Sequence, residues 1–150
     1  GIHWNSGSTT FDKSFFNSNW QQAIANASGG WNAAGASWAF IGDSNSDYDW
    51  STVYWPDSSK LADTTVTWES GSNHIISCGT VFNTRFPFST DHTWFSYDVE
   101  SVALHEFGHW LMLNHVSPTG PVMYGYLNMW QLKRSLTQDD INGIIAIYGS

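Results

Sequence analysis

The 150-residue sequence has little cysteine, little charge and no long apolar run. Its only cysteine, Cys78, excludes an internal disulfide. Five Lys and Arg residues against 13 Asp and Glu give a formal net charge of −8, which argues against binding to nucleic acid or to anionic membrane surfaces. No apolar run approaches the length that crosses a membrane. We therefore expect a soluble protein that has neither nucleic acid nor a membrane as its partner.

Aromatic residues, by contrast, are abundant: ten Trp, nine Phe and six Tyr within an apolar fraction of 41%. A chain of this length and composition can bury an ordinary hydrophobic core. We expect residues 1–150 to form one domain that acts as a monomer. The chain starts at Gly1 with neither a Met nor an apolar leader, so we interpret it as a mature or excised fragment.

Apolar periodicity predicts a helix, then several strands, then two more helices. The first helix covers residues 15–34, and the Gly-Gly pair at 29–30 is expected to kink it or to end its regular part. Ser96 or Asp98 can cap the second helix, and Thr137 the third. The β-like runs between the first two helices are rich in Val, Ile, Thr and aromatic residues and cover 37–41, 51–55, 64–68, 74–82 and 93–95. This order predicts an α+β fold.

The densest group of metal-binding side chains is HEFGHWLMLNH, residues 105–115. On a helix, His105 and His109 share a face, so that both imidazoles can reach one ion, and Glu106 lies one step round, close enough to a water on the metal. In this HExxH arrangement zinc acidifies water and the glutamate takes its proton. His115 supplies a third ligand and leaves a fourth position open, which is typical of a catalytic zinc site.

The chain must turn sharply after His109 if His115 is to reach the same ion. Met112 stands where such a turn favours glycine. A residue other than glycine at positive φ costs about 1–2 kcal/mol, and zinc binding at a structural site exceeds that several-fold. We therefore predict that Met112 adopts a left-handed or otherwise strained conformation. Met123 follows in the loop PTGPVMYGY, which we expect to turn beneath the site.

Several segments together resemble one protein family. HEFGHWLMLNH, then VMY, then SLTQDDINGIIAIYG are similar to the metzincin metallopeptidases, and within them to the matrixins. SYDVESVALHEFGH and LADTTVTW resemble a helix and a strand of the same family, and the resemblance is stronger from about residue 97 onward. It implies an α+β metzincin-like zinc protease domain, with a mixed twisted sheet, a long N-terminal helix, an active-site helix and a C-terminal helix.

The resemblance also assigns roles to individual residues. It makes His105, His109 and His115 the ligands of one catalytic Zn²⁺ and Glu106 the general base. It makes Met123 the Met-turn residue, packed under the zinc. It implies a secreted zinc-dependent endopeptidase (a hydrolase) that cleaves peptide bonds in peptide or protein substrates.

Substrate binding is expected along a strand and in one pocket. An extended peptide can pair with the edge of a sheet, and our candidate for that edge is the strand at 74–82. The resemblance implies an apolar S1′ pocket between the active-site helix and residues 121–126.

The sequence departs from the family pattern in three places. Met112 replaces the glycine of HExxHxxGxxH, and Gly125 stands where a proline follows the Met-Tyr pair. The HxD-containing segment with which vertebrate-type matrixins hold a structural zinc and calcium is missing, since only His74 and His92 are available. We therefore expect a differently shaped S1′ wall, and the sequence gives no support for a structural zinc.

Two further hypotheses come from other parts of the sequence. DSNSDYD places oxygen ligands suited to Ca²⁺ at alternate positions, Asp43, Asn45, Asp47 and Asp49. It lacks the glycine and the final glutamate of an EF-hand loop, so an ordinary acidic turn is the favoured alternative. The abundant aromatics support a second function hypothesis, a catalytically inactive zinc-containing domain that binds protein or glycan through an aromatic-rich surface.

Overall fold

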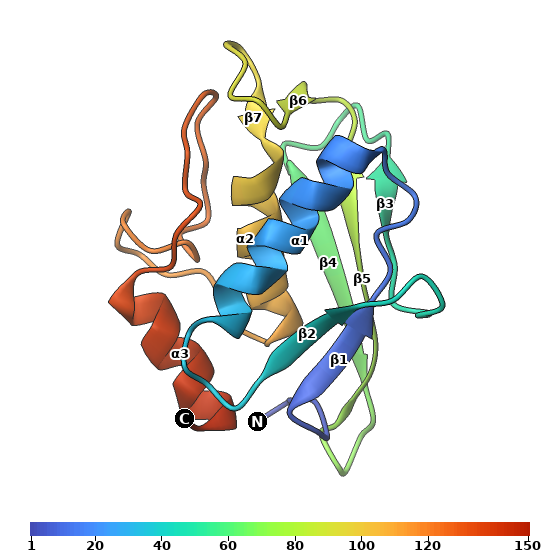
Figure 1. Cartoon of the computed structure of the whole chain (residues 1–150), viewed down its shortest axis with the longest axis vertical. Helices are drawn as coiled ribbons and strands as arrows, with labels where there is room; N and C mark the ends of the chain where they lie inside the picture. The colour runs from blue at the N-terminus through green and yellow to red at the C-terminus, as the bar shows by residue number, and fades with distance from the viewer.

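The computed structural model describes residues 1–150 and confirms an α+β fold with a mixed sheet (Figure 1). The elements in chain order are β1 (Ser8–Phe11), α1 (Ser18–Asn32), β2 (Ala39–Gly42), β3 (Trp50–Val53), β4 (Ala62–Trp68), β5 (Ile75–Asn83), β6 (Phe88–Ser89), β7 (Tyr97–Asp98), α2 (Val99–Trp110) and α3 (Gln138–Tyr148). The expected N-terminal, active-site and C-terminal helices are all present.

Strands β1 to β5 form a mixed sheet whose outer antiparallel strand is β4, while β6 and β7 pair in parallel with each other. β2 pairs with β1, and β3 with β5, in parallel, while β4 pairs antiparallel with β5. An isolated parallel bridge between Asp12 and Asp49 joins β1 to the segment that enters β3. The expectation that the strand at 74–82 forms the edge of the sheet is therefore wrong. This strand is β5, which pairs on both sides, and the free edge belongs to β4. Their burial agrees with these places: β5 carries buried residues along its length, including fully buried Phe82, whereas no residue of β4 is buried.

Helix α1 crosses in front of the sheet and packs against α2 (Figure 1). It continues through residues 29–30, so the Gly-Gly pair does not end it. A Cβ at Gly30 would lie 3.1 Å from Leu104 Cδ1, which indicates a close approach of the two helices. Trp31 is fully buried between them and donates its indole N–H to the carbonyl of Leu104 at 2.8 Å. The contact with α1 thereby helps to fix the orientation of α2.

The N-terminal caps of α2 and α3 are residues that the sequence offers as candidates. Asp98, rather than Ser96, caps α2 by accepting from the backbone N–H of Ser101. Thr137 and Asp140 form the reciprocal capping box of α3. The run at 93–95, in contrast, is not a strand, because Phe95 has a φ of 61° and the chain turns there.

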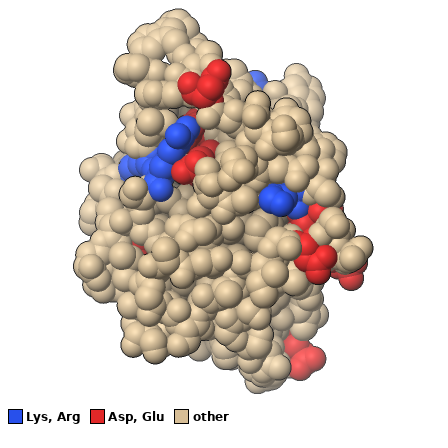
Figure 2. Space-filling model, viewed as in Figure 1, with Lys and Arg blue, Asp and Glu red and all other residues tan.

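Most of the visible surface carries no charge, and its few charged side chains lie in small groups (Figure 2). No helix is both long enough and apolar enough to span a membrane.

Candidate metal centre and its cleft

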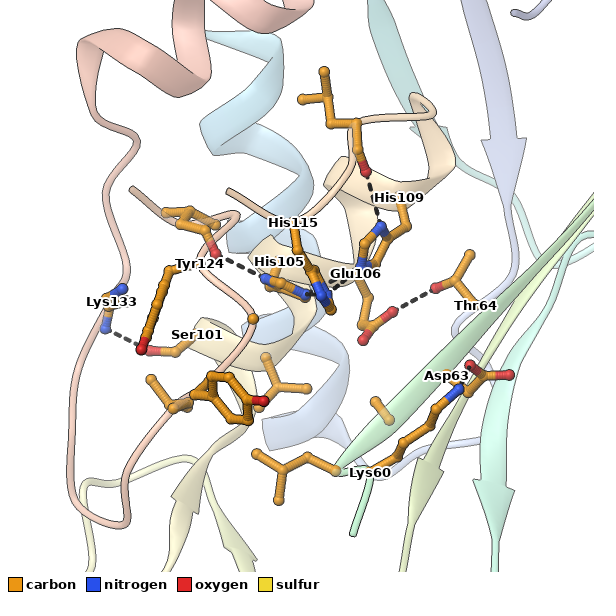
Figure 3. Close-up of a pocket in the computed structure, with 18 of the residues that line it drawn as sticks. Lys60, Asp63, Thr64, Ser101, His105, Glu106, His109, His115, Tyr124 and Lys133 are labelled. Atoms are coloured by element: carbon orange, nitrogen blue, oxygen red, sulfur yellow. Dashed lines mark hydrogen bonds and ion pairs between the residues drawn. The ribbon is translucent and has the colours of Figure 1, made fainter. Parts of the chain in front are cut away.

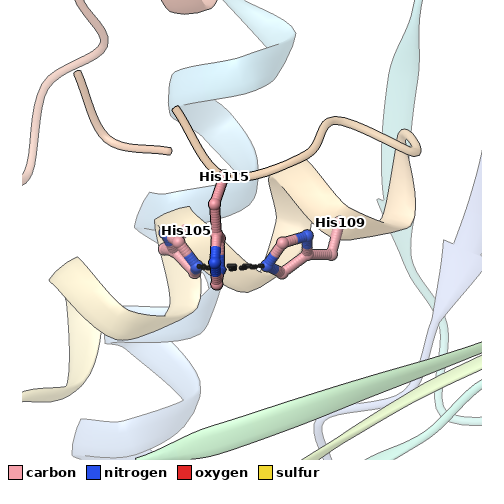
Figure 4. Close-up of side chains that lie close together, drawn as sticks. All are labelled: His105, His109 and His115. Carbon is pink, nitrogen blue, oxygen red and sulfur yellow. Dashed lines mark hydrogen bonds between the residues drawn. The ribbon is translucent and has the colours of Figure 1, made fainter. Parts of the chain in front are cut away.

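Three imidazoles meet at one point beside α2 (Figure 4). His105 and His109 lie one turn apart on the helix, and His115 approaches from the chain that follows it. The Nε2 atom of His105 lies 3.1 Å from the Nε2 atom of His109 and 3.1 Å from that of His115. The Nε2 atoms of His109 and His115 are 3.2 Å apart. No other group of three or more His, Cys, Asp or Glu side chains in the chain converges in this way.

The turn that brings His115 back is a Schellman motif with a methionine at its left-handed position. Met112 has a φ of 68°, as predicted. Its N–H donates to the carbonyl of His109 at 2.9 Å, and the N–H of Leu113 donates to that of Gly108 at 3.0 Å. These two bonds satisfy the last carbonyls of α2 and reverse the chain. The absence of glycine therefore does not prevent the turn.

Backbone carbonyls orient two of the three rings. Nδ1 of His105 lies 2.7 Å from the carbonyl of Val122, and Nδ1 of His109 lies 2.9 Å from that of Leu113. When each Nδ1–H donates to its carbonyl, each Nε2 carries a lone pair that faces the other rings. Burial, with the neighbouring histidines, lowers the pKa of His105 to about 4, and burial also lowers the pKa of His109. Both rings are therefore neutral at pH 7, the form that binds metal.

This donor set matches zinc. Nitrogens about 2.0–2.1 Å from a tetrahedral ion lie about 3.3–3.4 Å from one another, close to the separations found here. Three neutral imidazoles with no fourth protein ligand are typical of catalytic rather than structural zinc.

Two glycines allow the chain to close around the triad. Met123 is 2% exposed, and its sulfur lies against Gly108 of α2, where a Cβ would be only 2.2 Å away. A Cβ on Gly125 would lie 2.9 Å from Nδ1 of His115. The loop that carries Met123 is fastened by Asp140, whose carboxylate accepts from the N–H of Val122 and of Met123. Met123 is the residue that we expected to lie beneath the site from its place in the loop, whereas the anchoring of this loop by Asp140 was not expected from the sequence.

Glu106 lies beside the triad and is 5% exposed. Thr64 donates its hydroxyl hydrogen to Oε2 of Glu106 at 2.7 Å. Burial raises the pKa of Glu106 to about 7, and the bond from Thr64 works in the opposite direction. A carboxyl group with a pKa near neutrality can both accept and release a proton at pH 7.

The triad and Glu106 line a cleft of about 790 Å³. Figure 3 shows Lys60, Asp63 and Thr64 on the β4 side, with Tyr124 and Lys133 beyond the histidines. Four residues of the segment expected to shape the S1′ pocket line the cleft: Val122, Tyr124, Gly125 and Tyr126.

The candidate calcium ligands are not gathered in the structure. Asp43, Asp47 and Asp49 form no converging carboxylate group, and Oδ1 of Asp43 accepts from the N–H of Asn45 at 2.9 Å, which is a local turn. The calcium prediction thus finds no support in the arrangement of these side chains.

Comparisons with known proteins agree with the geometry. The sequence model of the family described as Matrixin matches residues 5–149. The chain is 48% identical over 67 residues to interstitial collagenase of Equus caballus, covering 41% of this chain and 14% of that protein. It is 46% identical over 67 residues to neutrophil collagenase of Homo sapiens, with coverages of 41% and 14%. It is 46% identical over 54 residues to metalloendoproteinase 1 of Glycine max, with coverages of 36% and 18%. The chain matches less than a fifth of the length of each relative.

Proposed function

The chain belongs to the matrixin family of zinc metalloendopeptidases, and on that basis we propose that it hydrolyses peptide bonds in protein substrates. The observation that carries this proposal is the convergence of three imidazole Nε2 atoms within 3.2 Å of one another, next to the buried carboxyl group of Glu106. We further propose that residues 1–150 are the catalytic domain, that it acts as a monomer, and that the protein is secreted, as expected from the family.

His105, His109 and His115 hold the zinc in this proposal. When bound, zinc acidifies a water molecule and polarises the scissile carbonyl. Glu106 is the general base: it accepts a proton from the water and delivers it to the departing amine. Its burial suits this role, because a pKa near 7 makes the carboxyl group able to gain and lose that proton at neutral pH.

The substrate binds as an extended strand along β4. Asp63, Thr64 and Val66 of this strand line the cleft, and β4 has a partner only on the side of β5. An unpaired strand edge offers backbone N–H and C=O groups to an extended peptide. This assigns to β4 the role expected from the sequence for the strand at 74–82.

The test combines metal removal with one substitution. We expect the purified, zinc-loaded protein to cleave a quenched-fluorescence peptide library and to lose activity on chelation. Glu106→Gln should lower kcat by at least about 100-fold, in the range of a lost general base, while the zinc content stays at that of the wild type. Full activity of the Gln variant would show that Glu106 is not the base.

A second candidate function is non-catalytic binding of a protein or glycan through exposed aromatic rings. Trp94 and Trp130 are 58% and 49% exposed, with ring centroids 5.0 Å apart, and His92 stacks on Trp130 at 4.8 Å. Such a surface can stack on sugars or on apolar side chains. A zinc-loaded protein that cleaves nothing in the library but binds a glycan, and loses that binding in Trp94→Ala, would favour this function.

A further inference from the structure

Four side chains form a continuous hydrogen-bonded row that ends on Glu106. The indole N–H of Trp110 donates to Oγ1 of Thr80 at 2.8 Å, and that oxygen lies 2.7 Å from Oγ1 of Thr64. Thr64 in turn donates to Oε2 of Glu106 at 2.7 Å. Trp110 and Thr80 are 0% and 1% exposed, so most of the row is closed to water. We call Trp110, Thr80 and Thr64 the support row.

The support row arises from strand register and helix period together. Thr64 and Thr80 are direct partners in the antiparallel ladder of β4 and β5. Glu106 and Trp110 lie four residues apart on α2, which places them on one face of the helix. The threonine pair therefore bridges two consecutive turns of α2, and a slip of one residue in the β4–β5 register would turn both hydroxyls away.

The direction of every hydrogen in the row is fixed by its two ends. An indole N–H can only donate, and an ionised carboxylate can only accept. Thr64 gives its single hydrogen to Glu106, so its oxygen accepts the hydrogen of Thr80, and the oxygen of Thr80 accepts from the indole N–H of Trp110. All the hydrogens therefore point towards the carboxylate.

We propose that Thr64, held by Thr80 and Trp110, is a positioning residue that fixes the Glu106 carboxylate for proton transfer. The inference rests on the proposed function. Thr64 occupies Oε2, whereas Oε1 receives no hydrogen bond from the protein. Oε1 takes the proton of the attacking water and passes it to the nitrogen of the broken peptide bond, after which Glu106 is ionised as before. Oε2 stays bonded to Thr64 throughout.

A purely structural reason for the row is weaker, because the same core tolerates an unbonded indole. Trp50 is also 0% exposed and stacks on Trp110 with ring centroids 5.8 Å apart. Its Nε1 has no hydrogen-bond partner. Burial of an indole here does not by itself require an acceptor, and the bond from Trp110 is the one that leads to the catalytic carboxylate.

The first test compares two threonines of the same strand. Thr64→Val removes the donor and keeps the shape, and we expect kcat to fall by about 10- to 100-fold, as for a small misplacement of a reacting group, with KM and zinc content unchanged. Thr65→Val is the matched control, since Thr65 is exposed and lies outside the cleft. Thr64→Ser keeps a hydroxyl at this position, so its kcat should stay close to that of the wild type and well above that of Thr64→Val.

The second test compares two tryptophans. Trp110→Phe and Trp50→Phe remove the same atoms from neighbouring buried rings, but only the former removes a hydrogen bond of the support row. We expect kcat to fall in the former alone. The zinc-free protein offers a readout without activity: the indole proton resonance that Trp110→Phe deletes should shift in Thr64→Val and stay in place in Thr65→Val.

The outcomes separate the two proposals. If the wild type cleaves peptides and Thr64→Val retains its kcat, or if Thr64→Ser fails to rescue, the positioning role is wrong and the proposed function stands. If the zinc-loaded wild type cleaves nothing, both are wrong. Should Thr64→Val fail to fold, the comparison of Thr64→Ser and the tryptophan pair with the wild type decides: equal kcat in all of them overturns the proposal.

Discussion

The sulfur of Met123 occupies the space that a side chain on Gly108 would need. A Cβ at Gly108 would lie 2.2 Å from Sδ of Met123 and 3.1 Å from Cζ2 of Trp31, and all three residues are buried. The loop beneath the triad thus packs directly on the backbone of the helix that carries His105 and His109. Helix and loop can approach this closely only because position 108 has no side chain.

Gly108→Ala should therefore destabilise the protein although alanine favours helix. We expect overpacking to lower the free energy of unfolding by about 1–3 kcal/mol. Gly29→Ala in α1 is the matched control: a Cβ there meets nothing within 4 Å, so helix propensity alone should raise stability by about 0.5–1 kcal/mol. Urea unfolding of the zinc-free proteins measures both. If both substitutions change the free energy of unfolding equally, the side chain of Met123 moves aside without destabilising the protein.

The sequence predicts those features that depend on neighbouring residues. The spacing of His105 and His109, the box of Thr137 with Asp140 and the positive φ of Met112 are all local, and each follows from helix period, capping or turn geometry. These features could be predicted from the sequence without knowing which residues pack against them.

Features that depend on pairing between distant segments were missed. The alternation of apolar and polar residues does not tell which strands pair with the strand at 74–82. We expected this strand at the edge of the sheet, but the edge strand is β4. The bond from Thr64 to Glu106 spans 42 residues and exists only in one β4–β5 register. No sequence pattern within β4 or α2 predicts this hydrogen bond.

Substitutions at position 112 measure the strain of the turn. Met112→Gly and Met112→Ala both lose the methionine side chain beyond Cβ and both keep the φ of 68°, which is unfavourable for alanine but not for glycine. Left-handed backbone costs about 1–2 kcal/mol without glycine, and glycine in turn loses about 0.5–1 kcal/mol of unfolded-state entropy. We expect the Gly variant to be more stable than the Ala variant by roughly 0.5–1 kcal/mol in thermal unfolding of the zinc-free proteins. A more stable Ala variant would mean that the turn is unstrained.

Gly125 should be needed for zinc affinity. A Cβ there would lie 2.9 Å from Nδ1 of His115, so Gly125→Ala pushes the ring away from the other two. We expect zinc affinity, measured by competition with a chelator, to fall by about 10- to 100-fold, as for other changes that disturb a ligand's support. Gly120→Ala in the same loop is the control, since its Cβ meets nothing within 4 Å. The same affinity in both variants would contradict this account of His115.

The pair Asp98–Arg134 should make stability depend on acid pH. Nη2 and Nε of Arg134 bind the two carboxylate oxygens of Asp98 at 2.6 and 2.9 Å. Burial alone would raise the pKa of Asp98, but the bonds from Arg134 and Ser101 outweigh it and lower that pKa. A lowered pKa contributes stability above the unfolded value of about 3.9, and this contribution is lost as the pH falls through the folded value.

Arg134→Met removes that contribution at neutral pH. We expect a loss of about 1–2 kcal/mol at pH 7, at the low end for bonds to a charged group because the side chain of Arg134 is 34% exposed. The difference from the wild type should shrink as the pH falls below about 4. Urea titrations of the zinc-free proteins at pH 7 and pH 3 measure it, and a difference that is the same at both pH values would exclude this origin.

Asp140 joins the C-terminal helix to the loop under the metal centre. One carboxylate oxygen accepts from the N–H of Val122 and of Thr137, both at 2.9 Å, and the other accepts from the N–H of Met123 at 3.3 Å. Because the carbonyl of Val122 accepts from His105 at 2.7 Å, a displacement of this loop moves a ligand ring. The start of α3 and the orientation of the triad therefore depend on the same buried carboxylate.

Asp140→Asn keeps the shape but turns an amide N–H₂ towards backbone N–H donors. At least one buried donor then loses its acceptor, which should lower the free energy of unfolding by about 1–3 kcal/mol and zinc affinity by about 10-fold or more. Asp139→Asn is the matched control, since Asp139 is exposed in the same helical turn and should cost at most about 0.3–1 kcal/mol through the helix dipole, with zinc affinity unchanged. Because the two substitutions remove the same charge from adjacent positions, a fall in zinc affinity in both would assign the effect to charge rather than to the anchoring of Val122 and Met123.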